Sequence, residues 1–181
     1  MRKYLNMGTK VVLQMKFKLL KISQILIGLI LRRDISITSE MSFMRLSHVS
    51  FRFMLGLLRS ILFLWRVGFL MSGANVRYSK KFYTNGKFII ETGSLIDCFS
   101  TGGVHVGKNF KLGRNSVISA PGSYLSCGHS IKIGDNVGLG EFCYIGGEAP
   151  VIIGSNTISG QYLSVHPENH IHVDEKLFRD S

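Results

Sequence analysis

The chain has 181 residues, 45% of them hydrophobic, and a formal net charge of +11 at pH 7. That length is enough for one ordinary globular core and a smaller appendage. Twenty glycines and only three prolines argue against a collagen-like chain and against a Pro-rich linker.

The N-terminal region carries almost all of the excess positive charge. Residues 1–70 hold 12 Lys or Arg against Asp34 and Glu40 and carry +10, whereas residues 71–181 carry +1. A basic region usually contacts nucleic acid or anionic lipid. Here the basic residues are interleaved with long aliphatic runs, such as VVLQMKFKLLKISQILIGLIL, and not with base-stacking aromatic residues. We therefore expect a membrane surface as the partner of this region, and no nucleic acid.

Four arginines recur every seven residues: Arg45, Arg52, Arg59 and Arg66, the last two within the second aliphatic run, MLGLLRSILFLWRVGFLM. On a helix, residues at this spacing drift by only about 20° per step, so the arginines would form one cationic line beside an apolar cylinder. We expect this helix to lie in the headgroup region, with its apolar face in the acyl boundary. That apolar face comprises Phe51, Leu55, Leu58, Leu62 and Phe69. The alternative is a helix that packs on its own protein with its arginines toward water.

Neither aliphatic run favours a signal peptide or a membrane span. The first run is broken by Lys16, Lys18 and Lys21 and is followed by no small-residue cleavage site. A span needs about 20 mostly apolar residues. Residues 22–31 are too few, and the later run contains two arginines. A transmembrane helix is the less favoured alternative.

Residues 1–72 are therefore predicted to form a basic amphipathic helical region that lies peripherally on the inner, cytoplasmic face of the cell membrane. The three cysteines, Cys98, Cys127 and Cys143, form no CxxC pair. They suit a reducing compartment, and we expect buried, inert thiols.

From residue 104 onward the sequence repeats itself. Three segments align: VHVGKNFKLGRNSVIS from Val104, IKIGDNVGLGEFCYIG from Ile131, and VIIGSNTISGQYLSVH from Val151. In each, a mostly aliphatic position recurs in steps of six. These positions are Val106, Leu112 and Ile118; Ile133, Leu139 and Ile145; and Ile153, Ser159 and Val165.

A six-residue step fits neither a helix nor a simple strand. It fits a solenoid with short strands as flat sides, one inward aliphatic residue per side, three sides per coil, and coils stacked about 4.8 Å apart. Glycines and asparagines then belong at the corners, where φ is positive. The stretch SAPGSYLSCGH is expected to contain a projecting loop, and residues 87–103 to form a degenerate earlier coil.

This repeat resembles the hexapeptide-repeat acyltransferases. The apolar basic N-terminal region, with IKIGDNVGLGEFCYIGG and SGQYLSVHPENH, is similar to the bacterial polysaccharide O-acetyltransferases of that family. The resemblance covers roughly residues 70–181. It implies an all-β left-handed parallel β-helix, here residues 73–181, preceded by basic apolar helices. It also implies a homotrimer, acetyl-CoA as co-substrate, and a sugar of a surface polysaccharide or glycolipid precursor as acceptor.

One histidine interrupts the pattern of small residues at the corners. The residue after each apolar step is Gly107, Gly113, Ser119, Gly134, Gly140, Gly146, Gly154, Gly160 and finally His166. Because small side chains fill the other eight places, we expect the imidazole to point outward, over Gly146. The resemblance implies that His166 is the general base, and an imidazole can take a proton from a sugar hydroxyl near neutral pH. An ordinary corner histidine is the alternative.

The residues next to His166 are further candidates. Glu168, Asn169 and His170 are expected either to orient the imidazole and bind the acceptor or to form an ordinary polar loop, and His172 is expected to face solvent. A zinc site is known in carbonic anhydrases of this fold. Against it, His166, His170 and His172 crowd one loop, and His105 and His129 lie too many coils below. We therefore expect no metal.

The resemblance also implies several coils after the histidine loop, whereas this chain ends at Ser181, fifteen residues beyond His166. The expectation is a β-helix domain truncated at its C-terminus. Two functions follow from the sequence. One is an acetyl-CoA-dependent O-acetyltransferase, and the other is a non-catalytic remnant or a structural membrane-associated subunit with the same fold.

Overall fold

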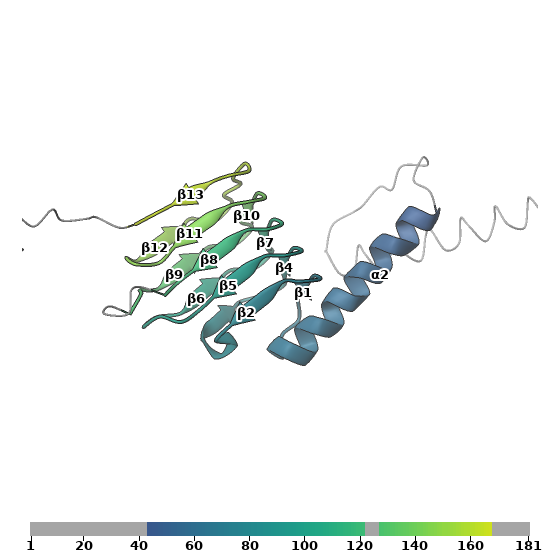
Figure 1. Ribbon diagram of the computed structural model, residues 1–181, viewed down its shortest axis with the longest axis horizontal. Coiled ribbons are helices and arrows are strands. Elements are labelled where there is room, and N and C mark those ends of the chain that lie inside the picture. Colours follow the sequence, from purple (N-terminus) through teal and green to yellow (C-terminus); the bar gives the residue numbers. More distant parts are fainter. Residues whose placement is uncertain (1–42, 122–126, 168–181) are drawn as a thin grey trace, which may run out of the picture. The chain divides into compact units, whose positions relative to one another are not determined.

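The computed structural model describes residues 43–121 and 127–167. The chain divides into two units, Met1–Leu55 and Gly56–Ser181. Helix α2 (Phe43–Arg59) begins in the first unit and ends in the second, and the described strands of the second unit, from Phe69 to Val165, form a parallel β-helix (Figure 1). The predicted solenoid is confirmed. Its left-handed winding stays a prediction, and any helix in residues 1–42 lies outside the described residues.

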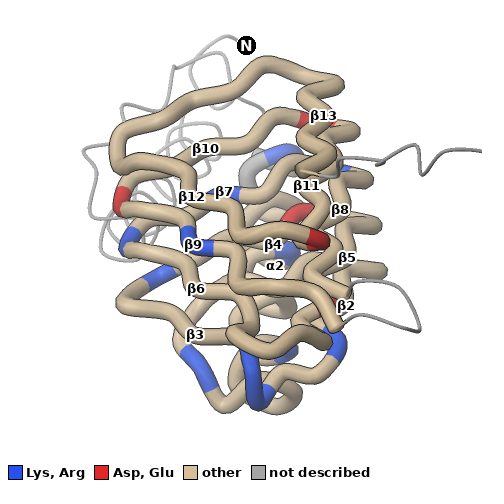
Figure 2. Tube along the Cα trace, turned by 90° about the vertical axis from the view of Figure 1, so that its left-hand side faces the viewer, with Lys and Arg blue, Asp and Glu red and all other residues tan. Residues whose placement is uncertain are grey.

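Three parallel sheets form the faces of the β-helix, and each coil adds one strand to each face. Face A contains β1 (Phe69–Leu70), β4 (Phe88–Ile90), β7 (Phe110–Leu112) and β10 (Gly138–Leu139). Face B contains β2 (Asn75–Arg77), β5 (Leu95–Asp97), β8 (Val117–Ser119), β11 (Tyr144–Gly146) and β13 (Ser164–Val165). Face C contains β3 (Phe82–Thr84), β6 (Val104–Val106), β9 (Ile131–Ile133) and β12 (Val151–Ile153). The strands of face C lie one above another in Figure 2.

The core is the column of side chains that points into this prism. Six of the nine predicted aliphatic steps are buried: Val106, Leu112, Ile118, Ile133, Leu139 and Ile145. Ile153 and Val165, in the last two described coils, are partly buried against the same core. The prediction of one inward residue per side holds only for face B. On faces A and C most three-residue strands bury both end residues, because side chains alternate along a strand and here the ends point inward.

Asparagines hold one corner of the stack, as predicted. Asn109, Asn136 and Asn156 have φ values of 57°, 56° and 61°. Their side-chain amides form a ladder, in which Asn109 Nδ2 donates to Asn136 Oδ1 at 2.8 Å and Asn136 Nδ2 donates to Asn156 Oδ1 at 3.0 Å. Asparagine tolerates this left-handed conformation better than most residues, and each amide also satisfies its neighbour.

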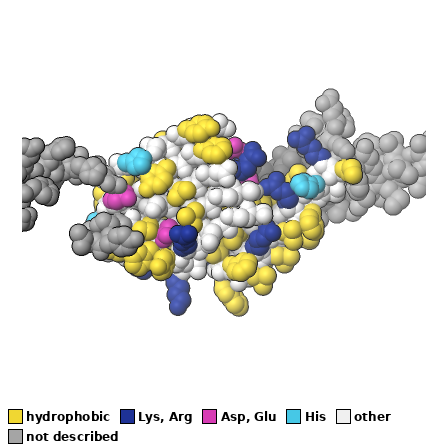
Figure 3. Space-filling model, viewed as in Figure 1, with side chains coloured by type: hydrophobic (Ala, Val, Ile, Leu, Met, Phe, Trp, Pro, Cys, Tyr) yellow, Lys and Arg dark blue, Asp and Glu magenta, His cyan; other side chains and the backbone are white. Residues whose placement is uncertain are grey.

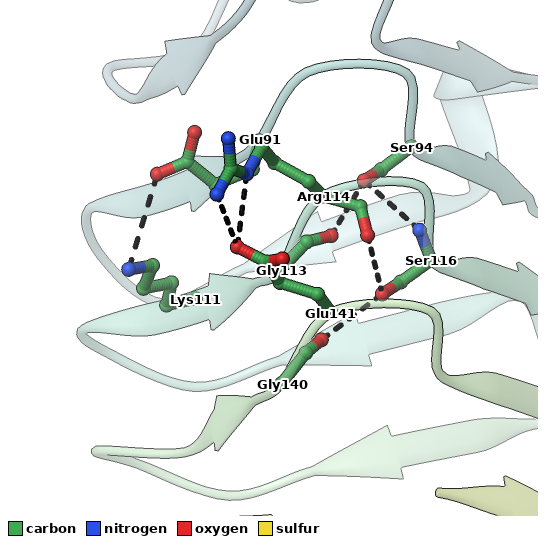
Figure 4. Close-up of polar contacts among 8 residues, drawn as sticks. All are labelled: Glu91, Ser94, Lys111, Gly113, Arg114, Ser116, Gly140 and Glu141. Carbon is green, nitrogen blue, oxygen red and sulfur yellow. Dashed lines mark hydrogen bonds and ion pairs between the residues drawn. The ribbon is translucent and has the colours of Figure 1, made fainter. Parts of the chain in front are cut away.

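Buried serines hold the corner between faces A and B (Figure 4). Ser94 Oγ donates to the Gly113 carbonyl at 2.7 Å, and Ser116 Oγ donates to the Gly140 carbonyl at 3.0 Å. Both side chains are buried, so these hydrogen bonds remove the cost of a hydroxyl without a partner. Outside them, Arg114 pairs with Glu141 of the next coil at 2.7 Å, in an exposed position.

The β-helix begins earlier than the repeat led us to expect. A coil formed by β1, β2 and β3, with a 3₁₀ helix η2 (Ser79–Lys81) before β3, precedes the predicted one, and β1 lies before residue 73. Phe69 is therefore buried in the core, and its predicted place in the acyl boundary is wrong. Gly68 permits this packing, because a Cβ there would lie 2.5 Å from the Phe88 ring.

The row of four arginines is not a single helical line. Helix α2 ends at Arg59, a π-helix η1 (Ser60–Leu64) follows, and Trp65 takes a left-handed φ of 54°. Arg66 therefore lies beyond the helix.

The predicted projecting loop falls in the long corner between β8 and β9, and its residues 122–126 lie outside the described residues. The chain rejoins the coil where Gly128 bridges Ser100. Cys98 and Cys143 are buried free thiols as expected, but Cys127, at the end of this loop, is exposed.

Candidate functional site

His166 directly follows β13, the uppermost described strand of face B. Val165 pairs with Ile145 and is partly buried against the core, so the alternation of side chains turns Ser164 and His166 outward. The imidazole is exposed. The prediction that this ring points away from the prism is confirmed.

Two contacts fix the orientation of the imidazole. Its Nε2 lies 2.7 Å from Ser164 Oγ, two residues earlier on the same face. Its ring stacks on Tyr144 of the coil below, with centroids 4.8 Å apart and planes inclined by 22°. If Nε2–H donates to Ser164, then Nδ1 carries the free lone pair and is the atom that can accept a proton.

A carboxylate lies at the Gly146 corner, below His166. The Glu148 side chain is half-buried, and its Oε2 is buried without a hydrogen-bond partner in the described residues. This oxygen lies 2.6 Å from the point where a Cβ of Gly146 would stand, and Pro167 Cδ and Tyr144 Cε1 lie 3.3 and 3.4 Å from the same point. Gly146 thus leaves room for Glu148 in the column below His166.

The Gly146 corner differs from the corner between faces A and B. At Gly113 and Gly140 an added Cβ would meet the backbone of the coil above, whereas at Gly146 it would first meet the Glu148 side chain. Tyr144, Gly146, Glu148, Ser164 and His166 together are called the His166 cluster below. A buried carboxylate oxygen without a donor is costly, so it favours a ligand that can donate a hydrogen bond to it.

The cluster therefore combines a proton acceptor, a hydroxyl and an unsatisfied carboxylate oxygen on one outward face. This arrangement can bind a hydroxyl compound and remove its proton.

The other predicted site residues are placed as follows. Glu168, Asn169, His170 and His172 lie outside the described residues. His105 lies on face C, where Nε2 is 2.9 Å from the Gly102 carbonyl and the ring stacks on Tyr83. Within residues 43–121 and 127–167 no three His, Cys, Asp or Glu side chains gather as metal ligands, and the prediction of no metal stays a prediction.

Sequence reasoning missed Tyr144, Ser164 and Glu148. Ser164 and Tyr144 had a usable signal, because each is two residues before the corner position of its coil and so shares a face with it. Glu148 had none, because it stands in an irregular corner between β11 and β12 whose conformation the repeat does not determine.

Comparison of the chain with protein-family models, with curated proteins and with solved structures finds no match. The resemblance to hexapeptide-repeat acyltransferases thus rests on the repeat itself.

Proposed function

We propose that this chain is an acetyl-CoA-dependent O-acetyltransferase. It transfers an acetyl group to a sugar hydroxyl of a surface polysaccharide or glycolipid precursor, with His166 as general base. One observation carries the proposal. At the position that follows each apolar step, where the other eight residues are glycine or serine, an exposed imidazole is held by a hydrogen bond and a ring stack, above the Gly146 corner that holds an unsatisfied carboxylate oxygen.

In the proposed reaction the imidazole takes the proton from the sugar hydroxyl as its oxygen attacks the thioester carbonyl. The tetrahedral intermediate collapses, the C–S bond breaks, and the CoA thiolate takes the proton from the imidazolium. Ser164 holds the ring in one tautomer, so that the same nitrogen accepts and returns the proton. Glu148 accepts a hydrogen bond from a second hydroxyl of the sugar and fixes its orientation.

The test is acetyl transfer from acetyl-CoA to a panel of sugars by the whole chain, measured by release of free CoA thiol. His166→Ala should lower kcat by at least about 100-fold, the range of general base catalysis. His105→Ala is the matched control, since His105 also stacks on a tyrosine of the neighbouring coil, and it should leave kcat unchanged. Equal rates for wild type and His166→Ala would overturn the proposal.

The assembly in this proposal is a homotrimer with the active site between subunits. Sedimentation equilibrium of the whole chain in mild detergent measures it directly. A monomer that retains full transferase activity would remove this part of the proposal and leave the role of His166 in place.

The proposal also locates the enzyme on the cytoplasmic face of the membrane. Residues 58–67 expose an apolar patch formed by Leu58, Ile61, Leu62, Phe63, Trp65 and Val67. Trp65 is 88% exposed and Phe63 is 69% exposed. Single apolar residues on a surface are ordinary, whereas several large ones close together in the chain indicate an interaction surface. Figure 3 shows hydrophobic side chains beside Lys and Arg along the described helical segment. Tryptophan and arginine beside an aliphatic surface suit the headgroup region of an anionic bilayer.

The structure also bears on the alternative of a membrane span. Ser47–Leu64 is long and apolar enough to cross a bilayer, and 17% of this stretch is buried. Helices of soluble proteins and signal sequences meet the same criterion. Extraction of membranes at alkaline pH separates the two cases, because it releases a peripheral protein and leaves a spanning one in place.

Vesicle flotation tests the surface itself. The triple variant Leu62→Ser, Phe63→Ser, Trp65→Ser should lower binding to phosphatidylcholine–phosphatidylglycerol vesicles by at least about tenfold, because each side chain loses about 1.5 kcal/mol or more of burial. The control triple Tyr83→Ser, Ile152→Ser, Ile158→Ser removes exposed apolar residues of the β-helix and should bind as wild type does. Equal binding by the two triple variants would contradict a lipid-facing patch.

A further inference from the structure

The corner between faces A and B changes its residue type near His166. The same corner position is occupied by Gly73, Gly93, Asn115, Phe142 and Tyr162 in successive coils, with φ values of 70°, 72°, 53°, 56° and 61°. Bulky side chains rarely adopt this left-handed conformation, whereas glycine and asparagine accept it cheaply. Aromatic residues replace them only in the two coils that carry Tyr144 and His166, at a cost in backbone strain.

The two aromatic rings form an exposed platform. Phe142 and Tyr162 lie nearly parallel, with centroids 5.3 Å apart and planes inclined by 10°. They are 44% and 70% exposed, so much of the ring surface faces water. Burial therefore does not account for the bulky side chains at this corner, and their faces are free to pack on another flat, partly apolar group.

The platform and the His166 cluster border the same strands of face B. Phe142 stands two residues before Tyr144, and Tyr162 stands four residues before His166. Four extended residues cover about 13 Å, which is longer than one pyranose ring. Tyr144 follows Phe142 by two residues in the chain, stacks on His166 and approaches the Gly146 corner, so aromatic side chains lead from the platform to the base.

We propose that this surface binds an extended glycan of at least two linked pyranose residues. The reacting sugar lies at His166 and Glu148, and a neighbouring sugar packs its C–H face on the Phe142–Tyr162 platform. The inference rests on the proposed function and narrows it: the acceptor is a chain, not a free monosaccharide. Hydroxyl groups satisfy the Glu148 oxygen by donating to it, whereas the phosphates of a nucleic acid would be repelled by the same carboxylate.

The test compares monosaccharides with tetrasaccharides of glucose, galactose and mannose as acceptors for the whole chain. The double variant Phe142→Asn, Tyr162→Asn removes the rings and keeps a residue that this corner already holds as Asn115. It should raise KM for a tetrasaccharide by about tenfold, the worth of a lost ring contact, and leave kcat and the monosaccharide KM unchanged. Calorimetric binding of the same tetrasaccharides should weaken to the same degree.

A second aromatic pair gives a matched control. Tyr78 and Phe99 are also exposed, with centroids 4.7 Å apart, and Tyr78 also has a positive φ of 52°. They lie at another corner and in earlier coils, so Tyr78→Asn, Phe99→Asn should leave both acceptors unaffected. Thermal melting of each variant reports whether it is folded.

The outcomes separate this inference from the proposed function. An unchanged tetrasaccharide KM in the Phe142, Tyr162 variant, with His166→Ala inactive, would overturn the glycan platform alone. A monosaccharide that binds as tightly as every tetrasaccharide would also overturn it, as would a change of oligomeric state in the variant, which would assign the rings to a contact between copies of the chain. Ring-dependent binding of a tetrasaccharide without any acetyl transfer would support the platform and refute the transferase.

Discussion

The β-helix and the segment that precedes it use similar aliphatic residues in opposite ways. In the β-helix, Ile96, Ile118 and Ile145 point into the prism and are fully buried. In residues 58–67, Leu62, Phe63 and Trp65 point into solvent. The aliphatic content of the two regions therefore does not explain why one set of side chains is buried and the other is exposed. In the β-helix, three sheets surround each inward side chain and exclude water from it. In residues 58–67, the described part of the chain does not cover these apolar side chains.

The burial of an apolar residue can be predicted from the repeat only where the residue belongs to a stacked coil. A residue at a stacked position must resemble the residues above and below it, so its environment recurs every coil. A residue outside the repeat has no such constraint. Exposure of apolar side chains there calls for a partner, and we have proposed the membrane.

The largest expected effect comes from a substitution in the column of side chains that points into the prism. Ile118→Ala removes a fully buried side chain between Ile96 and Ile145 and should lower the free energy of unfolding by about 4 kcal/mol. Ile152 is the matched control, because it is also an isoleucine in a strand but is 79% exposed, and Ile152→Ala should change stability by less than about 0.5 kcal/mol. Urea unfolding measures both. Similar losses for the two variants would contradict the assignment of an inside and an outside to the coils.

The sequence predicted the inward column well because a register error would have exposed several residues at once. Leu112, Leu139 and Ile145 are where the six-residue step puts them. It failed at Phe69, which has the same apolar character as Leu62 but begins the first coil. In the coils before Val104 the repeat is too degenerate to distinguish a core strand from the end of a lipid-facing helix.

The candidate site was predictable only in part. His166 was found because it breaks a pattern of small residues, and its outward direction was inferred from the same pattern. Phe142 and Tyr162 were not found, because their corner holds glycine or asparagine in the earlier coils and so shows no recurring residue type. Their importance depends on a positive φ and on a ring stack, which three-dimensional contacts reveal and residue spacing does not.

The asparagine ladder gives the next largest effect and sharpens the comparison, because only stacked coils can form one. Asn136→Ala breaks two side-chain hydrogen bonds and puts alanine, which tolerates the left-handed region less well than asparagine, at φ 56°, so it should lower the free energy of unfolding by about 2 kcal/mol. Asn136→Gly keeps the permissive backbone and loses only the ladder, and should cost about half as much. Chemical denaturation of the two variants separates the loss of the ladder hydrogen bonds from the backbone strain of alanine. If Gly costs as much as Ala, backbone strain plays no part.

The buried thiol of Cys98 provides a smaller, pH-dependent effect. Burial, and secondarily the Asp97 charge, raises its pKa from the ordinary 9.0 to about 12. A raised folded-state pKa contributes stability below pH 9 that is lost as pH rises toward about 12, because only the unfolded thiol ionises. Between pH 8 and 10 the loss should be about 1.4 kcal/mol.

The difference in urea unfolding between wild type and Cys98→Ala isolates this loss, since all other groups titrate alike in both proteins. Iodoacetamide at mildly alkaline pH should label the exposed Cys127 and leave Cys98 unmodified in the folded chain. An equal pH dependence of stability in the two proteins would show that the Cys98 thiol is not desolvated.

The smallest effect is expected at a contact that spans two coils but lies in water. Arg114 places Nε and Nη2 at 2.9 and 2.7 Å from Glu141 Oε1, which is the shortest ion pair among the described residues. Both side chains face solvent, so screening and side-chain entropy offset most of the attraction. Arg114→Gln should therefore leave the melting temperature unchanged within error, and high salt should not alter wild type more than the variant. A clear, salt-sensitive fall in melting temperature would mean that charged corners, and not only the inward column and its ladders, hold successive coils together.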